Sequence, residues 1–179
     1  MADIPVDSDP NKLLNWQTGS PGHVFLQINK INGSSNVTQN IGFYPKDGWK
    51  VTLTPAPVPG KLVDNAYHEF NASLKMALSP EQLRSVIAEI IYLSRFIRYD
   101  VDEYNCADFA LEVFNSVRSA KLVIPKYDVP GGLTADGTNT PQGIYNTLKE
   151  RQRLGGPEAA NIKIPGVKGW AGASYGPCN

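Results

Sequence analysis

The sequence has few cysteines and histidines, no net charge and no long apolar run, and each of these absences excludes a common class of protein or site. Its 179 residues include two cysteines and two histidines, too few for a disulfide framework, and the cysteines lack zinc-ligand spacing. Its 17 basic residues balance 17 acidic ones, and no cluster of Lys or Arg with interleaved aromatics marks a nucleic-acid surface. No apolar run reaches the roughly 18 residues that a membrane-spanning helix needs. These absences argue against a structural zinc site, a nucleic-acid binder and stable membrane insertion.

The N-terminal region also lacks the features of a secretory signal. Residues 1–17 are polar and contain proline, with neither a charged leading region nor an apolar core. We expect no signal peptide in this chain and an irregular lead-in over residues 1–21. The length and the hydrophobic share of 41% fit one soluble globular domain over residues 1–179, with an irregular Gly- and Pro-rich tail over residues 155–179.

Alternating residues predict several strands. Residues 23–31 (HVFLQINKI) alternate loosely between β-formers and polar residues, and a hairpin-type turn over residues 32–35 returns the chain as a second strand over 37–44. Residues 67–76 read as a further strand, and residues 50–53 as a short one. The sequence PAPVPG at 55–60 predicts a stiff surface connection, because proline lacks the donor that a helix or a central strand needs.

Helical signals follow in the second half of the chain. Ser79, Pro80 and Gln82 form a capping box with proline at the first helical position, and apolar residues behind them recur at helical spacing, which predicts a helix over 80–98. Further helices are predicted over 105–118 and 141–153. We therefore expect an α+β fold in which an antiparallel sheet from the His23, Val37 and Tyr67 segments packs against the first two helices.

Cys106 is the residue with the clearest chemical context. It lies in the first turn of a predicted helix, where free backbone donors and the helix dipole would lower the pKa of the thiol and could hold an oxyanion. His23, at the start of a strand, and His68 are the two available bases. Free cysteine is also among the most often buried residues, so a purely structural role for Cys106 stays open.

The motifs Gly22-His23-Val24-Phe25, Gly42-Phe43-Tyr44-Pro45, His68 and Tyr104-Asn105-Cys106-Ala107-Asp108-Phe109 resemble a known family. Their order and spacing are similar to circularly permuted NlpC-like papain-fold domains, found at the toxic C-termini of bacterial Rhs-type proteins and as secreted bacterial proteins. The likeness covers residues 22–149. In this permuted order the catalytic histidine precedes the cysteine, as it does in the lecithin:retinol acyltransferase group.

The resemblance implies that Cys106 is the nucleophile and His23 the base. The third member stays open among His68, Tyr44 and Asn40, since relatives carry a polar side chain on the strand after the histidine strand, and no Asp or Glu lies there. If the hairpin pairs residue 31 with residue 36, Tyr44 lies opposite His23.

Two residues before the nucleophile, Asn105 and Tyr104, are candidates for the oxyanion site or the pocket wall. Asp108 is expected to cap the helix rather than to act in catalysis. Trp16, Trp49 and Trp170 either line a substrate groove or pack in the protein, and Cys178 is expected to be a bystander. Residues 130–139 either form a flap over the site or an ordinary loop.

The resemblance also implies an activity. We expect a cysteine peptidase or amidase that forms a thioester and needs no metal or organic cofactor. Its relatives suggest an antibacterial effector that cleaves amide bonds in peptidoglycan peptides, acts in the periplasm of a target cell after delivery by a secretion apparatus, and is neutralised by an immunity protein. Two alternatives stay open: a lipid acyl hydrolase or acyltransferase of the lecithin:retinol type, and a catalytically silent domain that binds a partner.

Overall fold

A computed structural model describes residues 1–4, 21–33, 35–47, 56–127 and 137–176. Its centre is a five-stranded antiparallel sheet in the order β1-β2-β3-β4-β7. The strands are β1 (Ala2–Asp3), β2 (His23–Asn32), β3 (Ser35–Pro45), β4 (Val58–Asp64) and β7 (Arg98–Tyr99). The expected α+β class with a small antiparallel sheet is confirmed.

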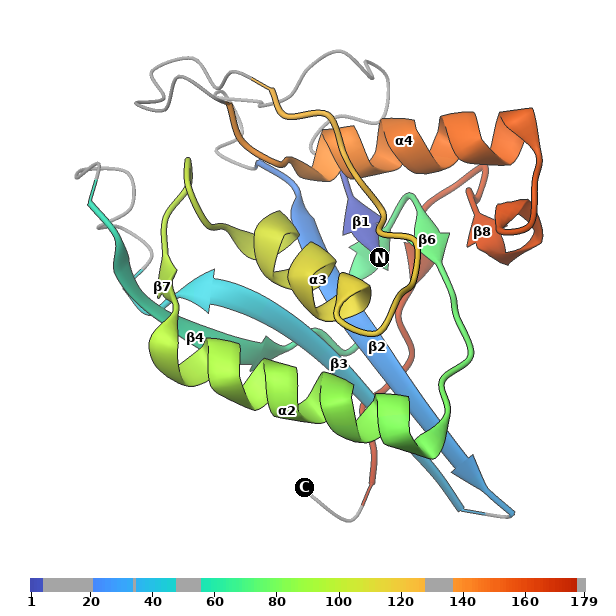
Figure 1. Ribbon diagram of the computed structural model, residues 1–179, viewed down its shortest axis with the longest axis horizontal. Helices are drawn as coiled ribbons and strands as arrows, with labels where there is room; N and C mark the ends of the chain where they lie inside the picture. Colours follow the sequence, from blue (N-terminus) through green and yellow to red (C-terminus); the bar gives the residue numbers. More distant parts are fainter. Residues whose placement is uncertain (5–20, 34, 48–55, 128–136, 177–179) are drawn as a thin grey trace.

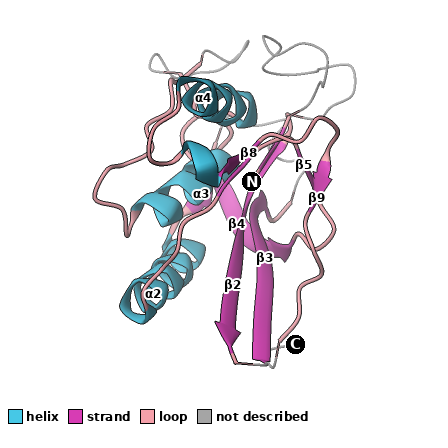
Figure 2. Ribbon diagram, turned by 90° about the vertical axis from the view of Figure 1, so that its right-hand side faces the viewer, coloured by secondary structure: helices cyan, strands magenta, loops and turns pink. Residues whose placement is uncertain are grey.

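Helices cover one face of this sheet (Figure 2). The helix α2 (Pro80–Phe96) begins at the Ser79–Gln82 capping box that the sequence predicts, and α3 (Cys106–Asn115) lies between α2 and α4 (Pro141–Leu154) (Figure 1). Phe43 packs there with apolar residues of both α2 and α3, and Val24 packs with Cys106 and with residues of α4. The three predicted helices are therefore confirmed to within a few residues.

Short two-stranded ladders lie outside the main sheet. One joins β5 (Glu69–Phe70) to β9 (Gly169–Trp170), and a separate ladder joins β6 (Ser73–Leu74) to β8 (Ile162–Lys163), which follows the 3-10 helix η1 (Ala159–Asn161). Phe25 of β2 packs against Phe70 and Ala171. The expectation of one strand over 67–76 is wrong, because the backbone turns at Tyr67, whose φ is +61°, and the segment divides into β5 and β6 outside the main sheet.

The expectation of a connection over residues 55–60 is also wrong for residues 58–60, which form part of a strand. Val58, Pro59 and Gly60 belong to β4, which lies between β3 and β7. Pro59 is tolerated because β7 pairs with only two residues of β4 and the ladder with β3 ends at the Gly60–Pro45 pair. Gly60 is needed there, since a Cβ would lie 2.2 Å from the Phe43 ring. The short strand predicted over 50–53 lies outside the described residues.

Both termini are more ordered than the sequence suggests. Ala2 and Asp3 pair with Val24 and His23, so the lead-in is not irregular at its start. The tail contributes η1, β8, β9 and a bridge from Tyr175 to β3, all in the part that was expected to be irregular. Ladder pairing with distant segments supplies the order that the local Gly and Pro content does not predict.

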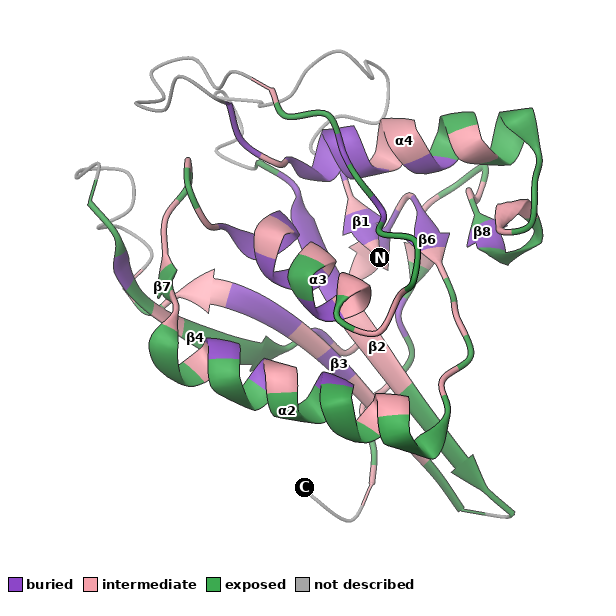
Figure 3. Cartoon of the chain, in the orientation of Figure 1, coloured by how far each residue is buried: buried purple, intermediate pink, exposed green. Residues whose placement is uncertain are grey.

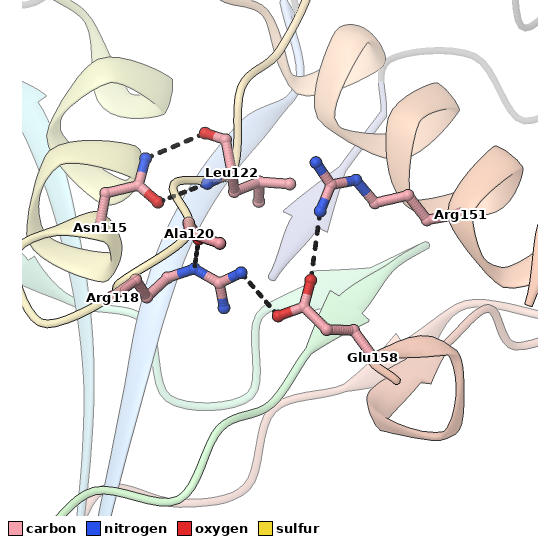
Figure 4. A network of polar contacts seen from close by, with 6 residues as sticks. All are labelled: Asn115, Arg118, Ala120, Leu122, Arg151 and Glu158. Carbon is pink, nitrogen blue, oxygen red and sulfur yellow. Dashed lines mark hydrogen bonds and ion pairs between the residues drawn. The ribbon is translucent and has the colours of Figure 1, made fainter. Parts of the chain in front are cut away.

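A polar network ties the tail to the helices (Figure 4). Glu158 accepts from Arg118 at 2.6 Å and from Arg151 of α4 at 3.1 Å. The Arg118 side chain is only 8% exposed and also donates to the backbone oxygen of Ala120. Asn115 at the end of α3 bonds both backbone groups of Leu122. The network thus holds the α3–α4 connection and the tail against α4.

Candidate functional site

Cys106 occupies the first position of α3, as the sequence predicts. Asn105 is the N-cap, and its Oδ1 accepts a hydrogen bond from the Ala107 N–H at 2.8 Å. In the other direction, the Asn105 N–H donates to the Asp108 carboxylate at 3.0 Å. This reciprocal capping box confirms the structural role expected for Asp108. The thiol is free and 6% exposed, and the backbone N–H of Val24 is directed at its sulfur.

The environment of the thiol keeps it protonated. Burial raises the pKa of Cys106 to about 11, although the N–H groups of Val24 and Ala107 lower it, and the Asp108 carboxylate raises it further. The expectation of a lowered pKa is therefore wrong for this structure. The helix-start donors are present, but removal of the thiol from water outweighs them.

His23 begins β2 and is buried on the face of the sheet opposite α3. Its ring is stacked on Tyr44 at 4.2 Å between centroids and on Phe25 at 6.2 Å, and the His68 ring lies edge-on at 5.4 Å. Burial, and then repulsion by His68, lowers the pKa of His23 to about 3. The imidazole is consequently neutral at physiological pH.

The expected position of Tyr44 beside His23 follows from the sheet register. Ile31 pairs with Asn36 and Phe25 with Gly42, and continuation of this register places Tyr44 opposite His23. The Tyr44 hydroxyl accepts from Asn65 Nδ2 at 2.7 Å. The Tyr44 ring therefore packs on the flat face of the His23 imidazole, and the Tyr44 hydroxyl holds the Asn65 amide, which faces the edge of the same imidazole.

Asn65 is the site residue that the sequence analysis missed. Its Oδ1 faces the Nε2 of His23 in a pocket left by Gly42, where an added Cβ would lie 2.0 Å from the first atom and 2.6 Å from the second. Neither atom makes a hydrogen bond in this structure, to the other or to any further partner, and the Asn65 side chain is buried. Asn65 follows β4 directly, and no motif in the sequence indicates that it reaches His23.

His68 belongs to a group of charged residues beside His23. Its Nε2 lies 3.6 Å from Asp3 Oδ2, too long for a hydrogen bond but close enough for an ion pair when His68 is protonated. Asp3 also pairs with Lys168 at 3.0 Å, which in turn contacts Glu69 at 3.1 Å. His68 thus contacts the His23 ring by its edge, whereas Asn65 faces the Nε2 atom directly.

Three other predicted residues have different partners. Asn40 is buried farther along β3, where it bonds Gln27, Ser174 and the backbone of Gly172, so it does not orient His23. The Asn105 amide donates to Val101, Thr138 and Asn139 and has no free donor for an oxyanion. The Tyr104 hydroxyl donates to Glu112 at 2.6 Å. The side-chain hydrogen bonds of Asn40, Asn105 and Tyr104 thus go to residues other than His23 and Cys106.

The two principal residues lie next to each other without touching through their side chains. The Cys106 sulfur lies against the peptide group that joins His23 to Val24, because the Val24 N–H points at it. The His23 ring, however, shares the face of Phe25, while Val24 shares the face of Cys106. In the described part of the chain no hydrogen bond joins the sulfur to the imidazole.

Among the described residues, none of the remaining predicted features is placed at this site. Trp170 is 65% exposed on β9, and Trp16, Trp49, Cys178 and most of the segment 130–139 lie outside the described residues. Among the residues that the structure describes, no group of three His, Cys, Asp or Glu side chains could hold a metal ion. None of the described helices is both long and apolar enough to cross a bilayer.

Comparisons of the chain with models of protein families, with curated proteins and with solved structures found no match.

Proposed function

We propose that the protein is a cysteine hydrolase in which Cys106 is the nucleophile, His23 the base and Asn65 the positioning residue. The observation that carries the proposal is the approach of the Asn65 amide oxygen to His23 Nε2, at the start of the strand whose next peptide group faces the Cys106 sulfur. An amide oxygen at Nε2 favours the proton on that nitrogen, which leaves Nδ1 as the basic atom. The imidazole would then accept the Cys106 proton through Nδ1.

The reaction follows from these roles. Substrate binding would bring the imidazole and the thiol together, and His23 would take the thiol proton as sulfur attacks the carbonyl carbon of an amide. The Cys106 backbone N–H at the helix start, which is directed at the Tyr99 hydroxyl in the resting structure, would exchange that partner for the oxyanion and stabilise it. His23 would then protonate the leaving nitrogen as the C–N bond breaks. Water, deprotonated by His23, would cleave the thioester to a carboxylic acid and restore the thiol.

The substrate class rests on the family resemblance of the sequence motifs. We propose an amide bond in peptidoglycan peptides, and with it the role of an antibacterial effector that a secretion apparatus delivers to the periplasm and an immunity protein neutralises. The electrically neutral resting pair suits such a role, because a buried thiol at a raised pKa is protected from reaction before substrate binds.

The test is digestion of purified peptidoglycan, with released peptides read by mass spectrometry. We expect cleavage by the wild type and by Cys178→Ala, the matched control for loss of a cysteine, and none by Cys106→Ala or His23→Ala. Asn65→Ala should reduce kcat by roughly tenfold to a hundredfold and alter the pH profile, because the imidazole loses its orienting partner. Expression directed to the periplasm should arrest growth only when Cys106 is present.

The buried, neutral thiol also favours a second function, a domain that binds a partner without catalysis. In that case Cys106 is a small core residue, packed with Val24 and Ala110. Growth arrest that persists in Cys106→Ala, together with no peptide release from peptidoglycan, would establish this second function in place of the first.

A further inference from the structure

The outer edge of β2 is paired only at its beginning. β1 pairs with His23 and Val24, and Met1 exchanges backbone hydrogen bonds with Phe25 at 2.8 and 3.0 Å. Beyond Phe25, β2 continues to Asn32 with β3 on one side. Among the described segments no strand pairs with the other side of residues 26–32.

The alternation of an antiparallel ladder shows which peptide groups are directed outward. Since the backbone of Phe25 bonds to Met1, the N–H and C=O groups of Gln27, Asn29 and Ile31 point to the same outer side. The residue that pairs with Asn29 confirms that the Asn29 peptide groups point outward. This residue is Thr38, whose own N–H and C=O groups point away from β2 and exchange hydrogen bonds with Tyr175 at 2.9 and 2.8 Å. The outer edge of β3 is therefore closed at this level by the tail, and that of β2 is open.

A groove runs along this open edge. Residues 26–32 of β2 form one wall, residues 73–80 form the other, and apolar side chains of α2 and α3 line it, among them Val86, Val113 and Phe114. Its volume is about 510 Å³. In Figure 3 the exposure of β2 rises along the strand toward the hairpin, so the edge becomes accessible where its pairing ends.

We propose that this groove binds one extended segment of a partner protein, which adds to β2 as an antiparallel strand in line with β1. An extended peptide supplies backbone donors and acceptors at the two-residue spacing that Gln27, Asn29 and Ile31 require. The apolar lining accommodates side chains at alternate positions of the segment. This interaction is independent of the proposed hydrolase activity.

The charge of the groove specifies the segment further. Its described lining includes Lys30 and Lys75 and no Asp or Glu, so it favours a segment that carries acidic residues beside its apolar ones. A second copy of this chain fits poorly. Residues 73–80 wall the β2 edge in every copy, so two such edges cannot meet inside the groove, whereas a single isolated strand can enter it.

The probe is a synthetic peptide of about seven residues, alternating Val and Thr with Glu at both ends, long enough to span the edge. Its control is the same peptide N-methylated at alternate residues, which cannot donate to a strand. In NMR titration we expect the first peptide to shift the amide signals of Gln27, Asn29 and Ile31 and to slow their hydrogen exchange. Absence of binding up to millimolar concentration, or equal binding of the methylated peptide, would overturn the proposal.

Two variants of Asn29 isolate the outward N–H group. Asn29→Ala and Asn29→Pro both remove the side-chain bonds to Thr38 and Gln27, but only proline also removes the N–H that points into the groove. We expect Asn29→Ala to bind the peptide as the wild type does, and Asn29→Pro to bind about tenfold more weakly, the effect of one lost hydrogen bond. Thermal unfolding of both variants shows that they are folded.

Charge reversal and self-association complete the test. Lys30→Glu with Lys75→Glu should weaken binding of the Glu-flanked peptide and strengthen binding of a Lys-flanked one. An unchanged preference would contradict the acidic character of the partner. If the protein alone forms dimers by analytical ultracentrifugation, and Asn29→Pro abolishes them, the occupant is a second copy and the proposal is wrong.

Discussion

The two ends of β2 have opposite environments within one strand. At its start, His23 is buried, paired with β1 and surrounded by Tyr44, His68 and Asn65. At its end, Ile31 is 75% exposed and its outer edge meets a groove. The first end suits chemistry that requires a dry, fixed pair of groups, and the second suits recognition of a chain that arrives from outside.

The comparison shows that pairing and burial, more than residue type, decide what a polar group can do. At the start of β2, which we call the closed end, the His23 imidazole loses its charge because burial removes its water. At the other end of β2, over residues 26–32, which we call the open end, the outward backbone groups keep access to water or to a partner because no described strand covers them. Each difference can be tested by a change that opens the closed end or closes the open one.

Acid should unfold the protein through the closed end. Since the pKa of His23 falls from 6.5 to about 3 on folding, the unfolded chain binds a proton that the folded chain does not, and stability decreases as the pH falls through this range. The contribution is about 1.4 kcal/mol per pH unit. Urea unfolding at a series of pH values should show this slope in the wild type and in His68→Gln, and a flatter one in His23→Gln. Equal slopes for wild type and His23→Gln would mean that His23 is not buried in its neutral form.

A side chain at Gly42 should disrupt the closed end directly. The Cβ of Gly42→Ala would overlap both Asn65 Oδ1 and His23 Nε2, and we expect a loss of about 3 kcal/mol in the free energy of unfolding. Gly33→Ala is the control at the open end, where no atom lies within 4 Å and only the φ of +59° opposes the change, at a cost of about 1 kcal/mol. Denaturant midpoints measure both, and similar losses would refute the tight packing around Gly42.

The resting thiol should react slowly. The pKa of Cys106 rises from 9.0 to about 11, so the thiolate near neutral pH is about a hundredfold less populated than in the unfolded chain. In a Cys178→Ala background, alkylation by iodoacetamide should be slower in the folded protein than in urea by at least this factor and should accelerate as the pH rises toward 11. Rapid alkylation below pH 7 that depends on His23 would instead reveal a thiolate–imidazolium pair in the resting state.

The sequence predicts the local features of this fold well. The helix that begins after Ser79 and the helix that begins at Cys106 follow from capping residues and apolar spacing, both local signals. The β2–β3 register also follows, since one hairpin turn fixes every pair, including the approach of Tyr44 to His23.

The remainder depends on contacts between distant segments. Asn65 reaches His23 only because β4 pairs with β3, and a segment rich in proline gives no local sign of that pairing. The pKa of Cys106 was predicted in the wrong direction because helix-start donors are visible in a sequence and burial is not. Asn40, Asn105 and Tyr104 were assigned to the site by position along the chain, but their side chains bond elsewhere.

The smallest expected effect is the most direct test of the open edge. Proline at Asn29 removes an N–H that points into the groove and leaves the ladder with β3 intact, so Asn29→Pro should be within about 1 kcal/mol of Asn29→Ala in unfolding free energy. Proline one residue earlier, Ile28→Pro, removes an N–H that bonds to β3 and should cost about 3 kcal/mol. Thermal and urea unfolding of the three variants measure the difference. If both prolines are equally damaging, the outer N–H of Asn29 already has a partner in the folded chain, and the edge is closed.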